Sequence, residues 1–178
     1  MKDLNIVFAG FGGQGILFAG KVVAYAGLIE GRELSWLPSY GPEMRGGTAN
    51  CSVIMSDEPV GSPIVYHPTE LIAMNGPSLK KFEDEVVPGG TVFLNSSIIK
   101  EKVDREDLRV IQVPCDTIAN ELGNGKVANM VMLGAYIAAT GALKADTLRE
   151  MIRQMFTGPK AKLVDLNMTA LARGMECV

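Results

Sequence analysis

The order of apolar and polar positions divides the chain into short apolar runs and longer amphipathic segments. Each short run is bounded by Gly, Pro or polar residues, which is typical of a buried strand. The expected strands are residues 4–9, 34–37, 48–55, 71–75, 91–94 and 108–113. Apolar residues at helical spacing predict helices over residues 16–28, 77–85, 116–122, 126–140 and 145–156.

Strands that alternate with helices in this way predict an α/β fold. We expect an open, mostly parallel, twisted sheet with helices on both faces, a Rossmann-like arrangement. The chain has 178 residues and no internal repeat or linker. Residues 1–178 are therefore expected to form a single domain.

Composition narrows the classes of function. The net charge is −3, so the chain offers no general attraction for nucleic acid. The longest apolar stretch, residues 127–143, is interrupted by polar residues and glycines, which indicates a buried helix and no membrane span. Cys51, Cys115 and Cys177 are too scattered for a metal or cluster motif or a disulfide framework, which favours a cytoplasmic location. Ten methionines in a small apolar protein favour a surface that a partner subunit covers.

A glycine-rich turn joins the first expected strand to the first expected helix. It reads Gly10-Phe11-Gly12-Gly13-Gln14-Gly15, the G-x-G-x-x-G pattern. Glycines allow a close backbone approach to a ligand, and the following helix offers free amides to a phosphate. A dinucleotide site also needs a carboxylate after the second strand, where this chain has Leu37-Pro38-Ser39-Tyr40. The turn therefore fits another phosphate-bearing ligand, or a structural role, better than NAD.

A second loop follows the second expected strand and reads Ser39-Tyr40-Gly41-Pro42-Glu43-Met44-Arg45-Gly46-Gly47. This loop is expected at the same carboxyl edge of the sheet as the glycine turn, where ligands bind in open α/β sheets. Arg45 beside two glycines can present its planar fork to a phosphate or carboxylate. Tyr40 can stack on a ring, and Glu43 can orient Arg45. The alternative is a surface loop in which the glycines serve turns and Arg45 pairs with Glu43.

Together, the two motifs resemble the gamma subunit of 2-oxoacid:ferredoxin oxidoreductases. A later run, Leu122-Gly123-Asn124-Gly125-Lys126-Val127-Ala128-Asn129-Met130, is similar as well, and the likeness covers nearly the whole chain. The segment Met44-Arg45-Gly46-Gly47-Thr48-Ala49-Asn50 resembles that of the 2-oxoglutarate members more than that of the pyruvate members.

The resemblance implies a share in an oxidative decarboxylation by a multi-subunit complex. A 2-oxoacid, 2-oxoglutarate in this case, and coenzyme A would give succinyl-CoA and CO2 while ferredoxin is reduced. Thiamine diphosphate, Mg2+ and [4Fe-4S] clusters would belong to the alpha and beta subunits, and to a delta subunit where one is present, and none would be bound by this chain alone. The chain would be inactive by itself and would hold no catalytic residue. Its expected part is assembly of the complex and the coenzyme A side of the site.

The residues expected at the coenzyme A path or at a subunit interface come from all three motifs. They are Gly10, Gly12, Gly13, Gln14, Gly15, Tyr40, Gly41, Glu43, Arg45, Gly46, Gly47, Asn124 and Asn129. A turn at Asn124 and an internal hydrogen bond at Asn129 are the simpler explanations of those two residues. Two other interpretations stay open: a free-standing nucleotide- or flavin-binding domain, and a purely structural interaction subunit.

Overall fold

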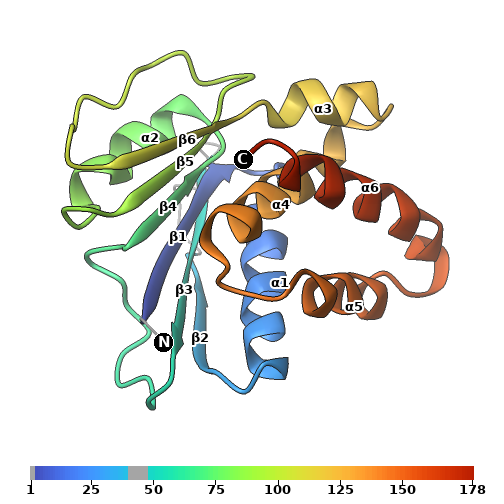
Figure 1. The fold of residues 1–178 in the computed structure, drawn as a ribbon, viewed down its shortest axis with the longest axis horizontal. Helices are drawn as coiled ribbons and strands as arrows, with labels where there is room; N and C mark the ends of the chain where they lie inside the picture. Colours follow the sequence, from blue (N-terminus) through green and yellow to red (C-terminus); the bar gives the residue numbers. More distant parts are fainter. Residues whose placement is uncertain (1–2, 40–47) are drawn as a thin grey trace.

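The computed structural model describes residues 3–39 and 48–178. They form one six-stranded sheet with helices on both faces (Figure 1). The strands are β1 (Leu4–Phe11), β2 (Glu33–Pro38), β3 (Thr48–Ser56), β4 (Glu70–Ala73), β5 (Thr91–Asn95) and β6 (Arg109–Val113). The α-helices are α1 (Ile16–Ile29), α2 (Gly76–Phe82), α3 (Cys115–Glu121), α4 (Ala128–Thr140), α5 (Ala145–Met155) and α6 (Val164–Met175). Short 3-10 segments are η2 (Glu83–Glu85), η3 (Gly125–Val127) and η4 (Gly158–Leu163).

The strand order is β2-β3-β1-β4-β5-β6, and the sheet grows outward from β1 in both directions. β1, β4, β5 and β6 are parallel, whereas β3 is antiparallel to both of its neighbours, β1 and β2. β2 therefore runs in the same direction as β1, and the expected mostly parallel sheet is confirmed. Because the strand order reverses at β1, the carboxyl end of β1 is the switch point of the sheet, where open α/β sheets bind ligands.

The two faces of the sheet are covered unequally. Ile6 and Phe8 of β1 point into a large core shared with α1, α4, α5 and α6. Val7 and Ala9, which alternate with them, point into a smaller core under α2. Figure 1 shows the same asymmetry, with α2 on one side of the sheet and most helices on the other. Burial on both faces explains why β1 is apolar at successive positions instead of alternating.

α4 and α6 pack with their backbones in direct contact. A Cβ added at Gly134 would lie 2.0 Å from the carbonyl oxygen of Leu171. A Cβ added at Gly174 would lie 1.9 Å from the carbonyl oxygen of Val131. Each helix therefore needs a glycine where it crosses the other, and this contact fixes the C-terminal half of α6 against the first half of α4.

The sequence predicted the strands and the first five helices within a few residues, but it gave no element after residue 156. The structure places η4 and α6 there. The buried stripe of α6 consists of Asn167, Ala170, Leu171 and Gly174. Because two of these four residues are not apolar, the stripe does not appear as hydrophobic periodicity in the sequence.

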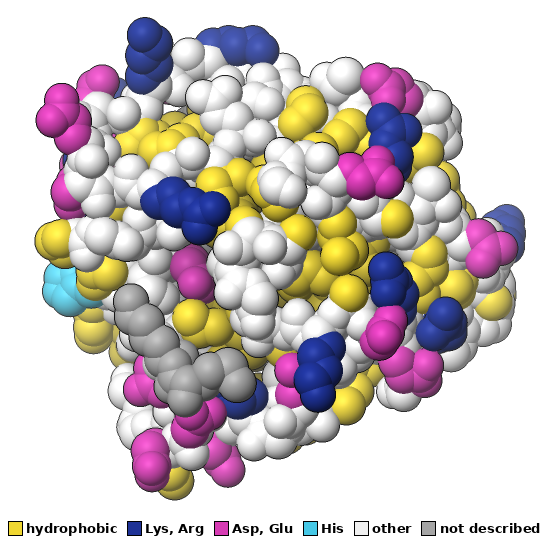
Figure 2. Space-filling view, in the orientation of Figure 1, with side chains coloured by type: hydrophobic (Ala, Val, Ile, Leu, Met, Phe, Trp, Pro, Cys, Tyr) yellow, Lys and Arg dark blue, Asp and Glu magenta, His cyan; other side chains and the backbone are white. Residues whose placement is uncertain are grey.

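The segment expected to be a buried helix is α4, and residues 128–137 are all buried in it. Within residues 3–39 and 48–178, no helix combines the length and the hydropathy that crossing a membrane requires. Figure 2 shows hydrophobic side chains reaching the surface around α4, α5 and α6, with charged side chains scattered about them. A partner subunit that covers apolar surface remains a prediction.

Candidate functional site

The glycine turn lies at the carboxyl end of β1 and leads directly into α1. Gly13 and Gly15 have φ angles of 92° and 73°, in the region that favours glycine. Gly15 is the N-cap of α1, and no side chain caps this helix in the part of the chain that the structure describes. The first-turn amides of α1 thus keep the capacity to donate to a ligand.

On the side that faces the sheet, Gln14 closes the crevice between β1 and β4. Its Oε1 accepts hydrogen bonds from the backbone N–H of Phe11 at 2.6 Å and from Nδ2 of Asn75 at 3.1 Å. Its Nε2 donates to the carbonyl oxygen of Met74 at 3.1 Å. Asn75, which is fully buried, also accepts from the N–H of Ser78 at 2.9 Å and caps α2. The protein's own amides thus occupy the switch-point crevice.

The polar edge continues toward β5 and α3. Asn95, fully buried at the end of β5, donates from Nδ2 to Oδ2 of Asp116 and, at 3.5 Å, to the carbonyl oxygen of Met74. Oδ1 of Asn95 accepts from the N–H of Ser97 at 3.3 Å. These groups hold the ends of β4 and β5 and the start of α3 together, which is a structural task.

On the side that faces the helices, the glycine turn meets the motif around residues 122–130. Nδ2 of Asn129 donates to the carbonyl oxygen of Gly15 at 3.2 Å. A Cβ at Gly15 would lie 2.3 Å from the same nitrogen, so only glycine permits this contact. Asn124 caps η3 by accepting from the N–H of Lys126 at 3.0 Å, which confirms its expected role in a turn.

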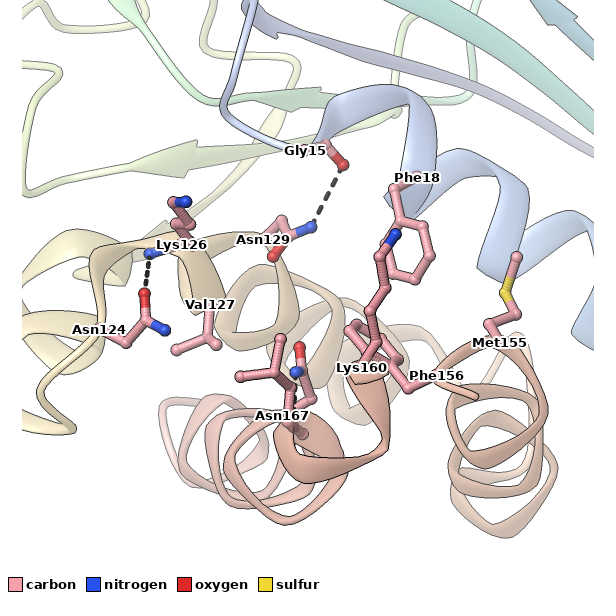
Figure 3. Close-up of a pocket in the computed structure, with 11 residues that line it drawn as sticks. Gly15, Phe18, Asn124, Lys126, Val127, Asn129, Met155, Phe156, Lys160 and Asn167 are labelled. Atoms are coloured by element: carbon pink, nitrogen blue, oxygen red, sulfur yellow. Dashed lines mark hydrogen bonds between the residues drawn. The ribbon is translucent and has the colours of Figure 1, made fainter. Parts of the chain in front are cut away.

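A pocket of about 270 Å³ opens beside this contact (Figure 3). It is enclosed by the N-terminal part of α1, by η3 and the start of α4, and by the segment from the end of α5 to α6. Its lining consists of Gly15, Phe18, Asn124, Lys126, Val127, Asn129, Met155, Phe156, Lys160, Leu163 and Asn167. The wall is mainly apolar, and two lysines and three side-chain amides supply polar groups.

Two aromatic rings form part of the apolar wall. Phe18 and Phe156 meet edge to face, with ring centroids 5.3 Å apart and an interplanar angle of 78°. Lys126 and Lys160 are both exposed and reach the same pocket from η3 and η4. An apolar wall with two cations at its edge suits a ligand that joins a flat ring system to anionic groups.

The structure brings two of the three predicted motifs together. Gly10, Gly12, Gly13, Gln14 and Gly15 form the turn, and Asn124 and Asn129 lie beside its helix-facing side. Tyr40, Gly41, Glu43, Arg45, Gly46 and Gly47 lie outside the described residues. The residues that flank that loop, Ser39 and Thr48, lie at the carboxyl edge of the sheet, where Thr48 pairs with Phe11. The expected placement of the loop's two ends is therefore confirmed.

Sequence reasoning missed several residues that line the pocket: Phe18, Met155, Phe156, Lys160, Leu163 and Asn167. Phe18 carried a usable signal, because it is a large aromatic residue three positions after the glycine turn, at the start of the helix expected over residues 16–28. Lys160 and Asn167 carried no signal, since they belong to the segment for which no element was predicted.

The three cysteines do not contribute to this site. Cys51 and Cys115 are buried, and Cys177 is half-buried. Burial raises the pKa of the Cys51 thiol to about 12 and raises the pKa of Cys115 well above its ordinary value. Both are therefore neutral thiols at neutral pH. Among residues 3–39 and 48–178, no group of three or more His, Cys, Asp or Glu residues is arranged to hold a metal ion.

Comparison with known proteins adds independent findings. The family model described as pyruvate ferredoxin/flavodoxin oxidoreductase matches residues 5–177. The ketoisovalerate oxidoreductase subunit VorA of Methanothermobacter marburgensis is 44% identical over 98% of this chain and 36% of that protein. The 2-oxoglutarate synthase subunit KorC of Methanocaldococcus jannaschii is 33% identical over 97% of this chain and 92% of that protein. The chain thus spans about a third of the length of the VorA relative, at 36%, and most of the KorC relative.

Two solved structures share the fold. A keto/oxoacid ferredoxin oxidoreductase gamma subunit from Geobacter sulfurreducens has a TM-score of 0.82 and 30% identity, over 97% of this chain and 96% of that one. The 2-oxoglutarate:ferredoxin oxidoreductase from Magnetococcus marinus, solved with 2-oxoglutarate, coenzyme A and succinyl-CoA bound, has a TM-score of 0.90 and 26% identity. That match covers 99% of this chain and 31% of the other.

Proposed function

This chain belongs to the pyruvate ferredoxin/flavodoxin oxidoreductase family, and on that basis we propose that it is the gamma subunit of a multi-subunit 2-oxoacid:ferredoxin oxidoreductase. The complex would convert a 2-oxoacid and coenzyme A into an acyl-CoA and CO2 and pass two electrons to ferredoxin. The near-complete overlap with a gamma subunit and with KorC supports this role.

Thiamine diphosphate, Mg2+ and iron–sulfur clusters would be held by the alpha and beta subunits, and by a delta subunit where one is present. The described residues of this chain do not fit a cluster, because Cys51 lies on β3 and Cys115 on α3 and both are buried neutral thiols. The electron-transfer steps therefore belong to the partner subunits in this proposal. Thiamine diphosphate supplies the carbanion chemistry of such enzymes.

Two substrates are supported by different observations. The loop sequence Met44-Arg45-Gly46-Gly47-Thr48-Ala49-Asn50 favours 2-oxoglutarate, and relatives named KorC are 2-oxoglutarate synthase subunits. The higher identity to VorA, 44% against 33%, favours ketoisovalerate. Assaying the purified complex with both 2-oxoacids, coenzyme A and ferredoxin decides between them by the ratio of kcat/KM.

The part that we propose for this chain is to bind the nucleotide end of coenzyme A in the pocket beside Gly15. The observation that carries this proposal is that the pocket joins an apolar, aromatic wall to Lys126, Lys160 and the uncapped N-terminus of α1. Adenine would pack against the apolar wall, and the phosphates would lie near the lysines. The solved relative with coenzyme A bound supports this ligand.

The competing dinucleotide interpretation fits the geometry less well. In a dinucleotide-binding sheet, the diphosphate approaches the switch point beside the glycine turn. Gln14 occupies this position in the present structure through its three hydrogen bonds to Phe11, Asn75 and Met74. On the opposite side of the turn, where Gly15 and Asn129 meet, the pocket has about 270 Å³, against about 200 Å³ beside Gln14 and Met74.

Binding at the nucleotide end has a distinct kinetic consequence. The reacting thiol lies at the far end of coenzyme A, so contacts to the nucleotide hold substrate and transition state equally. Removing such a contact raises KM for coenzyme A and leaves kcat unchanged.

The test compares Lys160→Ala with Lys162→Ala in the assembled complex. Both lysines are exposed on η4, but only Lys160 lines the pocket. Losing a charged hydrogen bond to phosphate should raise KM for coenzyme A about tenfold in Lys160→Ala. Lys162→Ala should change it less than about twofold, since an exposed charge outside the pocket is screened. Equal KM values for Lys160→Ala and wild type would exclude the pocket as the coenzyme A site and favour a purely structural subunit.

A further inference from the structure

Two side-chain amides in the pocket have oxygen atoms for which the described protein supplies no hydrogen-bond donor. Asn129 and Asn167 are 7% and 5% exposed, and the exposed part faces the pocket. Each uses only its nitrogen internally: Nδ2 of Asn129 donates to Gly15, and Nδ2 of Asn167 donates to the carbonyl oxygen of Leu163 at 2.7 Å. Figure 3 shows the two side chains on opposite walls, from α4 and α6, with their oxygens turned toward the space between.

These internal bonds determine which atom of each amide faces the pocket. Rotating either amide by half a turn would place its oxygen against the carbonyl oxygen of Gly15 or Leu163, and that contact is repulsive because neither atom carries a hydrogen. The pocket therefore presents the oxygens of these two residues as fixed acceptors. A buried polar side chain that keeps one unmet acceptor demands a donor from water or from a ligand.

The surroundings of the two oxygens limit the ligand further. Phe18, Val127 and Phe156 form apolar walls, so the donor belongs to a group with a flat apolar body. Lys126 and Lys160 favour a molecule that also carries an anionic part. An amino group attached to an aromatic base, in a molecule that carries phosphates, meets all three conditions. In coenzyme A this is the exocyclic amine of adenine, which has two N–H donors for two acceptors.

We propose that Asn129 and Asn167 recognise the exocyclic amine of the adenine base and so make the base a determinant of co-substrate choice. This inference rests on the proposed function, because it assigns atoms within the same coenzyme A pocket. A base that carries a carbonyl at the same position would bring an acceptor against two acceptors. A site built to hydrogen-bond an amine disfavours such an analogue, because its buried polar groups are then left unpaired.

The test measures KM for coenzyme A and for its analogue with hypoxanthine in place of adenine, in the assembled complex. The analogue keeps every phosphate and the thiol and exchanges only the amine for a carbonyl. Wild type should show a KM at least about tenfold higher for the analogue, with an unchanged kcat. Equal KM values in wild type would overturn the inference without the need for any variant.

Two substitutions assign the preference to Asn167. Asn167→Leu keeps the size and removes the acceptor, so the KM ratio between the two co-substrates should fall below about threefold. Asn167→Gln keeps both an amide oxygen and an amide nitrogen, so it should keep a preference for adenine. Retention of the full preference in Asn167→Leu would overturn the assignment.

Failure of this inference and failure of the proposed function give different results. If Lys160→Ala raises KM for coenzyme A while wild type uses both co-substrates equally, the pocket binds coenzyme A but does not select the base. If Lys160→Ala leaves KM unchanged, coenzyme A binds elsewhere, and both the proposed pocket and the base recognition are excluded.

Discussion

The two sides of the glycine turn are both lined with side-chain amides, but the amides are engaged differently. On the sheet side, Gln14 and Asn75 use oxygen and nitrogen alike in bonds within the protein. On the helix side, Asn129 and Asn167 use only nitrogen, and their oxygens face a pocket. A fully satisfied amide network holds a fold together, whereas a half-satisfied one leaves capacity for a ligand. The same residue type thus has a structural task on one side and, in our proposal, a binding task on the other.

The difference follows from how the two sides are built. The sheet side lies between adjacent parallel strands, β1 and β4, and the pocket beside Gln14 and Met74 has about 200 Å³. The helix side is assembled from α1, α4 and α6, and their packing depends on close approach at Gly134 and Gly174. Substitutions on the sheet side and on the helix side should therefore have separate effects on the stability of the fold and on ligand binding.

The largest expected effect comes from the contact between α4 and α6. In Gly174→Ala the new methyl group would lie 1.9 Å from the backbone oxygen of Val131, and backbone cannot move aside as a side chain can. We expect a loss of about 3 kcal/mol or more in the free energy of unfolding, even though alanine is the better helix former by about 1 kcal/mol. Urea unfolding followed by circular dichroism measures the difference.

Gly61→Ala is the matched control, because no atom lies within 4 Å of the added Cβ and its φ is not positive. It should change the free energy of unfolding by less than about 0.5 kcal/mol. A Gly174→Ala variant as stable as this control would show that α6 is not held against α4 as described.

The next effect concerns the satisfied amides on the sheet side. Asn75→Ala removes the cap of α2 and leaves Gln14 without one partner in a fully buried place. We expect a loss of about 2 kcal/mol in the free energy of unfolding. Asn124→Ala removes a cap of η3 at a half-buried position and should cost about 0.5–1 kcal/mol. If Asn75→Ala and Asn124→Ala were equally stable, the contrast between the sheet side and the helix side of the glycine turn would be wrong.

These contrasts also show how far the sequence alone reaches. The strands and the glycine turn could be predicted, because apolar runs and glycines act locally. The meeting of Gly15 with Asn129 could not, since 114 positions separate the two residues and only the fold brings them together. Asn167 could not be predicted for another reason. It lies on the buried stripe of α6, where Asn167 itself and Gly174 stand in place of the apolar residues that would identify a helix.

The dinucleotide question shows the same limit. The missing carboxylate after Pro38 could be recognised in the sequence and weakens the NAD interpretation. The hydrogen bonds that Gln14 makes at the switch point could not be predicted, because the sequence presents Gln14 only as a member of the glycine motif. Its three hydrogen bonds to Phe11, Asn75 and Met74 became visible only when β4 was placed beside β1.

A smaller effect tests whether the core beneath the turn excludes water. The Cys51 thiol lies 3.8 Å from the carbonyl oxygen of Ile16, and burial raises its pKa to about 12 from 9.0. Because the folded pKa is above the unfolded one, the contribution to stability is complete below pH 9 and is lost as pH rises toward 12. Between about pH 8 and pH 10, Cys51→Ala should lose about 1 kcal/mol less of its free energy of unfolding than wild type.

Urea unfolding at about pH 8 and pH 10 measures how the free energy of unfolding changes with pH in each protein. Burial also raises the pKa of Cys115 and of Tyr136, so both proteins should become less stable in alkali. Identical slopes for wild type and Cys51→Ala would mean that water reaches the thiol in the folded state.

The smallest effect on the free energy of unfolding is expected for a substitution of Gly12, on the outside of the glycine turn. No atom lies within 4 Å of a Cβ added there, and φ is not positive, so the described protein does not itself require glycine. Gly12→Ala should therefore match Gly61→Ala within about 0.5 kcal/mol in the free energy of unfolding.

In the assembled complex, however, a bare backbone that faces the coenzyme A path or a partner subunit should not tolerate a methyl group. We expect KM for coenzyme A, or the dissociation constant of the subunits, to rise several-fold in Gly12→Ala and not in Gly61→Ala. If both quantities equal those of wild type, nothing approaches the turn from outside, and the functional surface is confined to the helix side at Gly15.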